Sequence, residues 1–127
     1  MDLARSADWR DRLGLDRRWH VTPLELLRRV HWRFRVPSRY SQDGACYDAD
    51  GYEVNWRSRQ AVRWSLFGAL LLAEPDDHAT RGAAHRAILG NSRKHNGGAI
   101  VALNLRSTHT EILARLDAAI ARLEAAA

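Results

Sequence analysis

Apolar residues recur at helical spacing along most of this chain, which predicts a mainly α-helical protein. The strongest local signal starts at Thr22, a helix-capping residue that is followed by Pro23 and, three positions after the cap, by Glu25. This order forms a capping box with proline at the first helical position, and Pro37 ends the helix at about Arg35. One side of this helix carries a stripe of residues suited to a core: Leu24, Leu27, Val30, His31 and Phe34.

A longer apolar segment lies in the middle of the sequence. Residues 60–74 read QAVRWSLFGALLLAE, and Arg63 is the one charge before the terminal Glu74. A helix that is apolar on every side is buried, so we expect this segment to form the central helix of the core and to end at Pro75. The absence of a side chain at Gly68 would let a neighbouring segment approach the helix closely.

The C-terminal half carries further helix signals. An aspartate at 76–77 can cap a helix that Gly90 ends, and Thr108 with Glu111 forms a second capping box before a final helix. Residues 99–105 (AIVALNL) are ambiguous between a strand and a short helix, because so short an apolar run shows no clear period.

Helical periodicity disappears between residues 37 and 60, and this loop contains the one credible β structure in the sequence. The Asp-Gly pair at 50–51 is a typical tight-turn sequence. On either side of the turn, Tyr47, Tyr52 and Val54 alternate with polar residues as in a small hairpin. We therefore expect a short β-hairpin inserted between helices.

These segments, with a further short helix over residues 3–13 that Gly14 ends, predict a mainly α fold: a single compact domain of about five helices with one small β-hairpin. A length of 127 residues with 46% hydrophobic and 28% charged residues is sufficient for such a core and excludes a disordered or fibrous chain. The predicted organisation is an N-terminal helix and approach at 1–20, an Arg-rich helix at 22–35, a loop and hairpin at 36–59 and a helical core at 60–126.

Positive charge is concentrated in the first half of the sequence. The formal net charge is +5, and residues 1–64 hold thirteen arginines against nine acids. Because all basic residues but Lys94 are arginine, the high isoelectric point reflects a genome rich in G and C as much as nucleic-acid binding. No apolar run has the length of a signal peptide or a membrane span, and a single cysteine, Cys46, excludes a disulfide framework. These features predict a soluble, cytoplasmic protein without a membrane partner.

The face of the Arg-rich helix opposite its apolar stripe also includes a tryptophan. Guanidinium groups and an exposed indole can anchor an acidic partner protein, or they can hold phosphates and stack an unpaired base. Alternatively, Trp32 packs under the 37–59 loop, and the arginines are solvated or paired with acids of that loop such as Asp43, Asp48 or Asp50. Of the two functional interpretations we favour a protein partner over nucleic acid, because a basic stripe alone is a weak sign of nucleic-acid binding. The predicted partner-binding residues are Arg28, Arg29, Trp32, Arg33, Arg35 and Arg39.

The loop before residues 99–105 is a second candidate site. Its cations and glycines lie beside a possible helix start, whose backbone amides can hold an anion. The sequence matches neither of two glycine-rich phosphate-binding motifs, GxxxxGK[ST] and GxGxxG, so a flexible loop between helices is the alternative. The possible anion-binding residues are Arg93, Lys94, His95, Gly97 and Gly98.

Signals for catalysis or metal binding are weak. Glu74 and His78 have an i, i+4 spacing, but Pro75 breaks that geometry and no third ligand follows at a known spacing. We therefore predict no metal site and no cofactor. Ser65 lies in an apolar segment without a GxSxG turn, which favours a core hydroxyl over a nucleophile. A small enzyme or small-molecule binder with a pocket near Ser65 and Asn104 is the remaining alternative to a binding protein.

Five segments follow one another in a recognisable order: Trp32, 48–51 (DADG), 61–70 (AVRWSLFGAL), 99–104 (AIVALN) and 110–113 (TEIL). This order resembles a family of small actinobacterial and phage proteins catalogued only as a domain of unknown function. The resemblance covers about residues 22–123. It implies kinship of fold and a connection with phages or mobile elements.

The chain departs from that family pattern at positions that could carry chemistry. Family members often have a cysteine after the tryptophan matched by Trp32, a second cysteine where this chain has Ser65, and Trp-Asn-Asp at residues 103–105. Here Arg33 and Ser65 occupy the cysteine positions, and only Asn104 of the last motif remains. The resemblance therefore implies a degenerate member in which any thiol or metal chemistry of the family is lost.

The final predicted helix offers a possible route to self-association. Its apolar residues follow a 4, 3, 4 spacing that can pair two chains, although packing in the core is the alternative. These residues are Ile112, Leu116, Ala119 and Leu123. Taken as a whole, the sequence predicts a small non-enzymatic protein that docks a macromolecular partner through its Arg-rich helix and the 37–59 loop.

Overall fold

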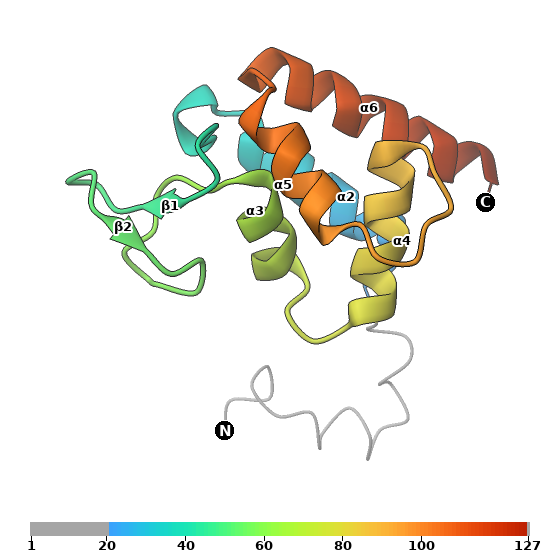
Figure 1. Ribbon diagram of the computed structural model, residues 1–127, viewed down its shortest axis with the longest axis horizontal. Coiled ribbons are helices and arrows are strands. Elements are labelled where there is room, and N and C mark those ends of the chain that lie inside the picture. The colour runs from blue at the N-terminus through green and yellow to red at the C-terminus, as the bar shows by residue number, and fades with distance from the viewer. Residues whose placement is uncertain (1–20, 127) are drawn as a thin grey trace.

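The computed structural model describes residues 21–126, so the predicted helix over residues 3–13 lies outside the described part. Five α-helices and a two-stranded antiparallel hairpin make up this part (Figure 1), which confirms a mainly α fold with one small hairpin. In chain order the elements are α2 (Pro23–Phe34), the 3-10 helix η3 (Pro37–Arg39), β1 (Cys46–Tyr47), β2 (Glu53–Val54), α3 (Leu66–Ala73), α4 (His78–Leu89), α5 (Gly97–Leu105) and α6 (His109–Ala126).

Helix α2 lies at the centre of the helix packing, in contact with α3, α4 and α6. Its start follows the capping sequence, because the Thr22 side chain accepts a hydrogen bond from the Glu25 N–H at 3.1 Å. Leu24, predicted to lie in the core, is only half-buried, whereas Leu26 is fully buried. Three surrounding helices bury a wider side of α2 than the single stripe that the sequence predicts.

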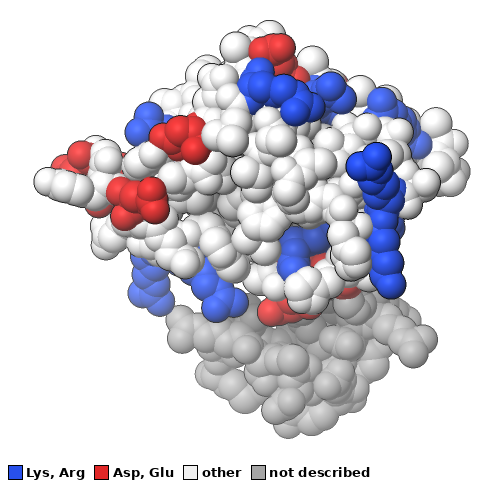
Figure 2. Space-filling model, in the orientation of Figure 1, with Lys and Arg blue, Asp and Glu red and all other residues white. Residues whose placement is uncertain are grey.

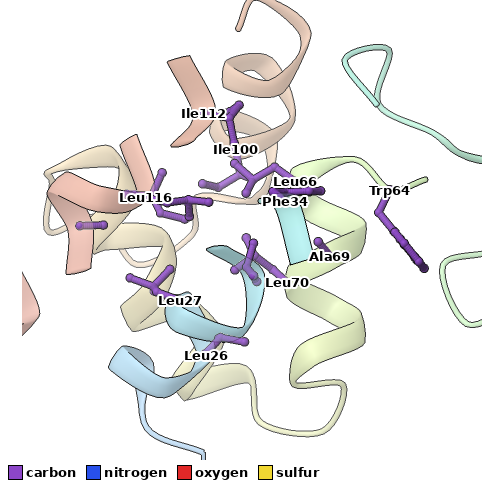
Figure 3. Close-up of a cluster of buried hydrophobic side chains, with 14 of the residues drawn as sticks. Leu26, Leu27, Phe34, Trp64, Leu66, Ala69, Leu70, Ile100, Ile112 and Leu116 are labelled. Atoms are coloured by element: carbon purple, nitrogen blue, oxygen red, sulfur yellow. The ribbon is translucent and has the colours of Figure 1, made fainter. Parts of the chain in front are cut away.

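The hydrophobic core fills the space between α2 and the other helices. Figure 3 shows Leu27, Leu70, Ile100 and Leu116 within one cluster, while Trp64 lies to one side of it. The four aliphatic side chains are completely buried. Removing each from water contributes about 1.5–3 kcal/mol, so this cluster supplies much of the favourable energy of folding.

The prediction of a helix over residues 60–74 is wrong in its first part. Helix α3 begins only at Leu66, with the buried Ser65 as its N-cap. The preceding segment is extended, and the Trp64 N–H donates a hydrogen bond to the Arg39 carbonyl oxygen at 2.8 Å. Backbone bonds to distant segments satisfy the polar groups that a helix would satisfy locally, so tertiary contacts decide the conformation here.

The predicted ends of the later helices are confirmed. The Asp77 side chain accepts from the Thr80 N–H at 3.0 Å at the start of α4, and Gly90 ends that helix in the left-handed conformation with φ 68°. Before α6, the Thr108 N–H donates to Glu111 Oε1 at 2.9 Å, and the Glu111 N–H donates to Thr108 Oγ1 at 3.3 Å. This reciprocal pair is the capping box that the sequence predicts.

The ambiguous segment 99–105 is helical and forms most of α5. Ile100, Leu103 and Asn104 are buried where α5 packs against α3 and α4. Helix α6 crosses one side of the molecule (Figure 1) and buries Ile112, Leu116 and Ala119 in the core. None of the helices in residues 21–126 is both long enough and apolar enough to cross a membrane.

The hairpin forms at the predicted turn, with Cys46 paired to Val54 and Gly51 in the left-handed conformation (φ 85°). Cys46 lies against α3, where a Cβ added at Gly68 would approach the Cys46 Sγ to 2.8 Å. Glycine at position 68 therefore permits the close approach that the sequence suggests. It brings the hairpin and α3 into direct contact.

Candidate functional site

The predicted partner-binding residues come together on one side of α2. We call Arg28, Arg29, Trp32, Arg33, Arg35 and Arg39 the Arg/Trp surface. Four of them, Arg28, Arg29, Trp32 and Arg33, line a hollow of about 440 Å³ together with Leu72 and Ala73 of α3. Arg35 caps the C-terminal end of α2 and Arg39 ends η3. The helix and the adjoining turn thus place cations around a partly apolar depression.

Trp32 is exposed, with 59% of its surface accessible to solvent. The alternative that Trp32 packs under the 37–59 loop is therefore wrong. The guanidinium carbon of Arg35 lies 3.9 Å from the centroid of the Trp32 ring, and that of Arg39 lies 5.7 Å from it. Cation–π attraction of this kind contributes about 0.5–1 kcal/mol at an exposed site and holds the indole and guanidinium groups in a defined arrangement.

Within residues 21–126, most arginines of the Arg/Trp surface have no acidic partner. Arg28 forms an ion pair with Glu124 at 2.8 Å, and in the described part of the chain the other arginines of the surface form none. The loop acids are used elsewhere: Asp43 accepts from the Ser41 hydroxyl and the Ala45 N–H. The positive charge of the surface is therefore largely unneutralised.

Arg33 joins the Arg/Trp surface to the extended segment before α3. Its guanidinium carbon lies 4.4 Å from the centroid of the Trp64 ring. Partial burial, and then the positive charge of Arg39, lower the pKa of Arg33 from its ordinary value. Burial is the larger cause of this change, and the positive charge of Arg39 acts in the same direction.

A second hollow, of about 690 Å³, lies between α3, α4 and the start of α5. We call it the α5 hollow. Of the predicted anion-binding residues, Lys94, His95 and Gly97 line it, whereas Arg93 and Gly98 do not. Figure 2, in the orientation of Figure 1, shows basic side chains bordering this region, and acidic side chains both over the hairpin and at the lower edge of this region.

Helix α4 contributes cationic and titratable residues that the sequence reasoning did not assign to this site. Arg81, His85 and Arg86 line the α5 hollow, and Arg81 and His85 are themselves buried, with 7% and 8% of their surfaces exposed. The Arg81 guanidinium donates to the Glu74 carbonyl oxygen and, at 2.8 Å, to His78 Nδ1. The sequence did contain one indication of these residues: Arg81 and His85 are four positions apart, a spacing that places both side chains on one side of a helix.

His85 has an incomplete set of hydrogen bonds. Its Nε2 is buried and has no hydrogen-bond partner among residues 21–126, and its ring lies 6.0 Å, between centroids, from the ring of Phe67. Burial, and then the positive charges of Arg81 and Arg86, lower the pKa of the imidazole from its ordinary value. A buried polar atom without a partner costs about 1–3 kcal/mol, so this atom calls for a functional explanation.

Ser65 and Asn104, the centre of the small-molecule alternative, are both buried and hydrogen-bonded to backbone. Ser65 Oγ accepts from the Gly68 N–H at 3.1 Å. Asn104 Oδ1 accepts from the Leu66 N–H at 2.9 Å, and Asn104 Nδ2 donates to the Ser41 carbonyl oxygen at 3.0 Å. Through these bonds both polar side chains stabilise the start of α3. Within residues 21–126, no group of three His, Cys, Asp or Glu residues is placed to hold a metal ion.

In comparisons with known proteins, no family model, no curated protein and no solved structure matches this chain at a significant level. The resemblance to the small actinobacterial and phage family therefore stays a prediction.

Proposed function

We propose that this chain is a non-enzymatic binding protein of the cytoplasm that docks an acidic partner protein on the Arg/Trp surface. The observation that carries the proposal is the exposed Trp32 among arginines of which, in the described part of the chain, only Arg28 has an acidic partner. Tryptophan and arginine are the residues that most often dominate the energy of protein interfaces. Their position on a packed helix limits the entropy lost on binding.

The surroundings of Trp32 favour a protein over a nucleic acid. The nearest guanidinium, that of Arg35, already covers the Trp32 ring at 3.9 Å, whereas stacking of a base needs an open ring face. Leu72 and Ala73 add an apolar wall to the hollow, which suits an aliphatic side chain. Acids of α6 lie close by, because Glu124 pairs with Arg28 and Asp117 lies 2.8 Å from His31. These acids would repel a continuous phosphate backbone.

The experiment compares two labelled probes by fluorescence anisotropy: a peptide that alternates glutamate and leucine, and single-stranded DNA. Wild-type protein is compared with the double variant Arg29→Glu/Arg35→Glu, because both residues are exposed. We expect the peptide to bind and the variant to lose at least about tenfold in affinity, since two charge reversals change a screened interaction by more than 1.4 kcal/mol.

A matched control carries the same change of charge outside the Arg/Trp surface. Arg106 and Arg115 are both exposed, and Arg106→Glu/Arg115→Glu should bind the peptide within about twofold of wild type. Tight DNA binding that weakens steeply as salt is added, together with weak peptide binding, would show that the partner of the Arg/Trp surface is a nucleic acid and not a protein. An equal loss of peptide affinity in both double variants would show that the loss comes from the change in net charge alone. This result would refute the Arg/Trp surface as the binding site.

A further inference from the structure

The start of α5 presents backbone N–H groups without a side-chain cap. Asn96 occupies the N-cap position, but its side chain makes no capping hydrogen bond. Instead, Asn96 Nδ2 donates to the Arg93 carbonyl oxygen at 2.9 Å and to Asn91 Oδ1 at 3.2 Å. The first amides of α5, beginning at Gly97, are left to another acceptor, and the helix end carries about half a positive charge.

The same hollow gathers further positive charge and contains no acidic residue among its described wall residues. Arg81, Arg86 and Lys94 line it together with Gly97. Arg81 is held in place by its bonds to the Glu74 carbonyl and His78, so its charge is fixed at the wall and not free to turn into solvent. Fixed guanidinium groups beside a helix N-terminus are the usual components of a site for a tetrahedral oxyanion.

His85 gives an independent indication of a ligand. With 8% of its surface exposed it is more than nine-tenths buried, it forms part of the wall, and its Nε2 has no hydrogen-bond partner. The protein thus leaves an imidazole in the wall of the α5 hollow unsatisfied. The helix start and this imidazole come from two different elements and line the same hollow.

The side of the hollow that α3 forms is apolar and indicates what the anion is attached to. Phe67 and Leu71 of α3 line the hollow opposite the cations of α4. A volume of about 690 Å³ is larger than an inorganic ion needs and falls in the range of small-ligand sites. The ligand therefore combines an anionic group with an apolar or aromatic body.

We propose that the α5 hollow is a binding site for a small organic phosphate, whose phosphate group lies against the start of α5, Arg81 and Lys94 and whose apolar body contacts Phe67 and Leu71. The site is separate from the Arg/Trp surface, because the described residues that line the two hollows have no member in common. It does not depend on the proposed protein partner.

The test is a titration of the ¹⁵N-labelled protein with phenyl phosphate and with inorganic phosphate, followed by amide NMR shifts. We expect saturable shifts at Gly97, Gly98 and His85, and tighter binding of phenyl phosphate because its ring contacts the apolar wall. Shifts that fail to saturate, or that concentrate on the arginines of α2, would overturn the proposal. Equal affinity for the two probes would overturn the apolar part of the site.

Three variants separate charge from shape. Gly97→Asp puts a carboxylate at the start of α5, where it favours the helix but repels phosphate, and should weaken phenyl phosphate binding about tenfold. Gly97→Ala adds only a Cβ, which would lie 3.5 Å from the Phe67 ring, an ordinary contact, and should bind within about threefold of wild type. Thr110→Asp adds the same charge to the first turn of α6 and should also bind as wild type. Unchanged binding by Gly97→Asp would refute the site.

Discussion

The two basic regions of this protein differ in how they hold their charge. On the Arg/Trp surface, arginines project from α2 around the exposed Trp32 and remain in contact with water. In the α5 hollow, Arg81 and His85 are more than nine-tenths buried and lie beside an uncapped helix start. Exposed cations are screened by salt and suit a large partner, whereas fixed and partly desolvated cations suit one small anion. Arginine content alone therefore does not distinguish these two kinds of site.

The two regions also differ in their effect on the stability of the folded protein. Exposed arginines of the Arg/Trp surface lose little hydration, so the surface is compatible with a stable fold whether or not a partner is bound. The α5 hollow retains a buried imidazole atom without a partner, which destabilises the ligand-free protein. A ligand that satisfies this atom gains affinity from it, whereas at equal affinity and ligand concentration binding at either region raises the stability of the protein by the same amount.

The largest expected effect comes from Asn104→Leu, which breaks the support that both regions share. Asn104 is completely buried, and its side chain bonds to the Leu66 N–H at the start of α3 and to the Ser41 and Gln42 carbonyl oxygens. Leucine leaves these three backbone groups unsatisfied, so we expect urea unfolding to show a loss of roughly 3 kcal/mol or more.

The neighbouring Leu105 provides the control for Asn104→Leu. Leu105 is 52% exposed, so Leu105→Asn should change the free energy of unfolding by less than about 0.5 kcal/mol. If Asn104→Leu lowers the free energy of unfolding by less than about 1 kcal/mol, the two regions do not depend on the hydrogen bonds of Asn104.

A smaller effect concerns Tyr40, which anchors the end of η3, and with it the Arg/Trp surface, to the end of α5. The Tyr40 hydroxyl lies 2.6 Å from the Ser107 carbonyl oxygen and 3.0 Å from that of Asn104, and it shares its one hydrogen between them. Burial, and then the negative charge of Glu111, raise the pKa of Tyr40 to about 12 from an ordinary value of 10.0.

This shift predicts the direction of a pH effect. Below the ordinary pKa, Tyr40 is protonated in both the folded and unfolded states and pH has no effect through it. As pH rises toward about 12, the unfolded state loses the proton first, so the free energy of unfolding falls by roughly 2 kcal/mol in total. Urea unfolding across this range should show the fall in wild type and lack this component in Tyr40→Phe. Identical slopes for the two proteins would contradict the assignment.

The smallest expected effect, and the one that separates the two regions most directly, comes from His85→Phe. Phenylalanine keeps an aromatic ring beside Phe67 and removes the unsatisfied Nε2, so we expect the free energy of unfolding to rise by about 1 kcal/mol. Phenyl phosphate binding should weaken, while binding of the acidic peptide stays unchanged. A matched His95→Phe change in the exposed loop should leave stability unaltered within about 0.5 kcal/mol. A destabilised His85→Phe protein would show that the imidazole is satisfied in another way.

The sequence predicted those features that depend on neighbours along the chain. Caps at Thr22, Asp77 and Thr108 and the glycine stop at Gly90 act within one helical turn, and all four lie where predicted. Residues 60–64 could not be predicted in this way, because their extended form depends on backbone bonds to η3 and the hairpin.

The same distinction holds for the candidate sites. The arginines of α2 could be placed on one face from their periodicity, and the loop before α5 could be singled out by composition. The inward position of Arg81 could not, since a buried arginine depends on acceptors such as the Glu74 carbonyl, which only the fold places beside it. The sequence therefore indicated the residues that the loop before α5 contributes to the α5 hollow, and missed the residues that α4 contributes.

Helix α3 contributes a wall to both hollows. Leu71 lines the α5 hollow and Leu72 lines the hollow of the Arg/Trp surface, although they are consecutive residues in a helix of 8 residues. Successive residues of a helix are turned by about 100°, so a rotation of α3 about its axis moves both walls together. A ligand in one hollow that turned α3 would therefore reshape the other hollow as well, and thermodynamic linkage would make such an effect mutual.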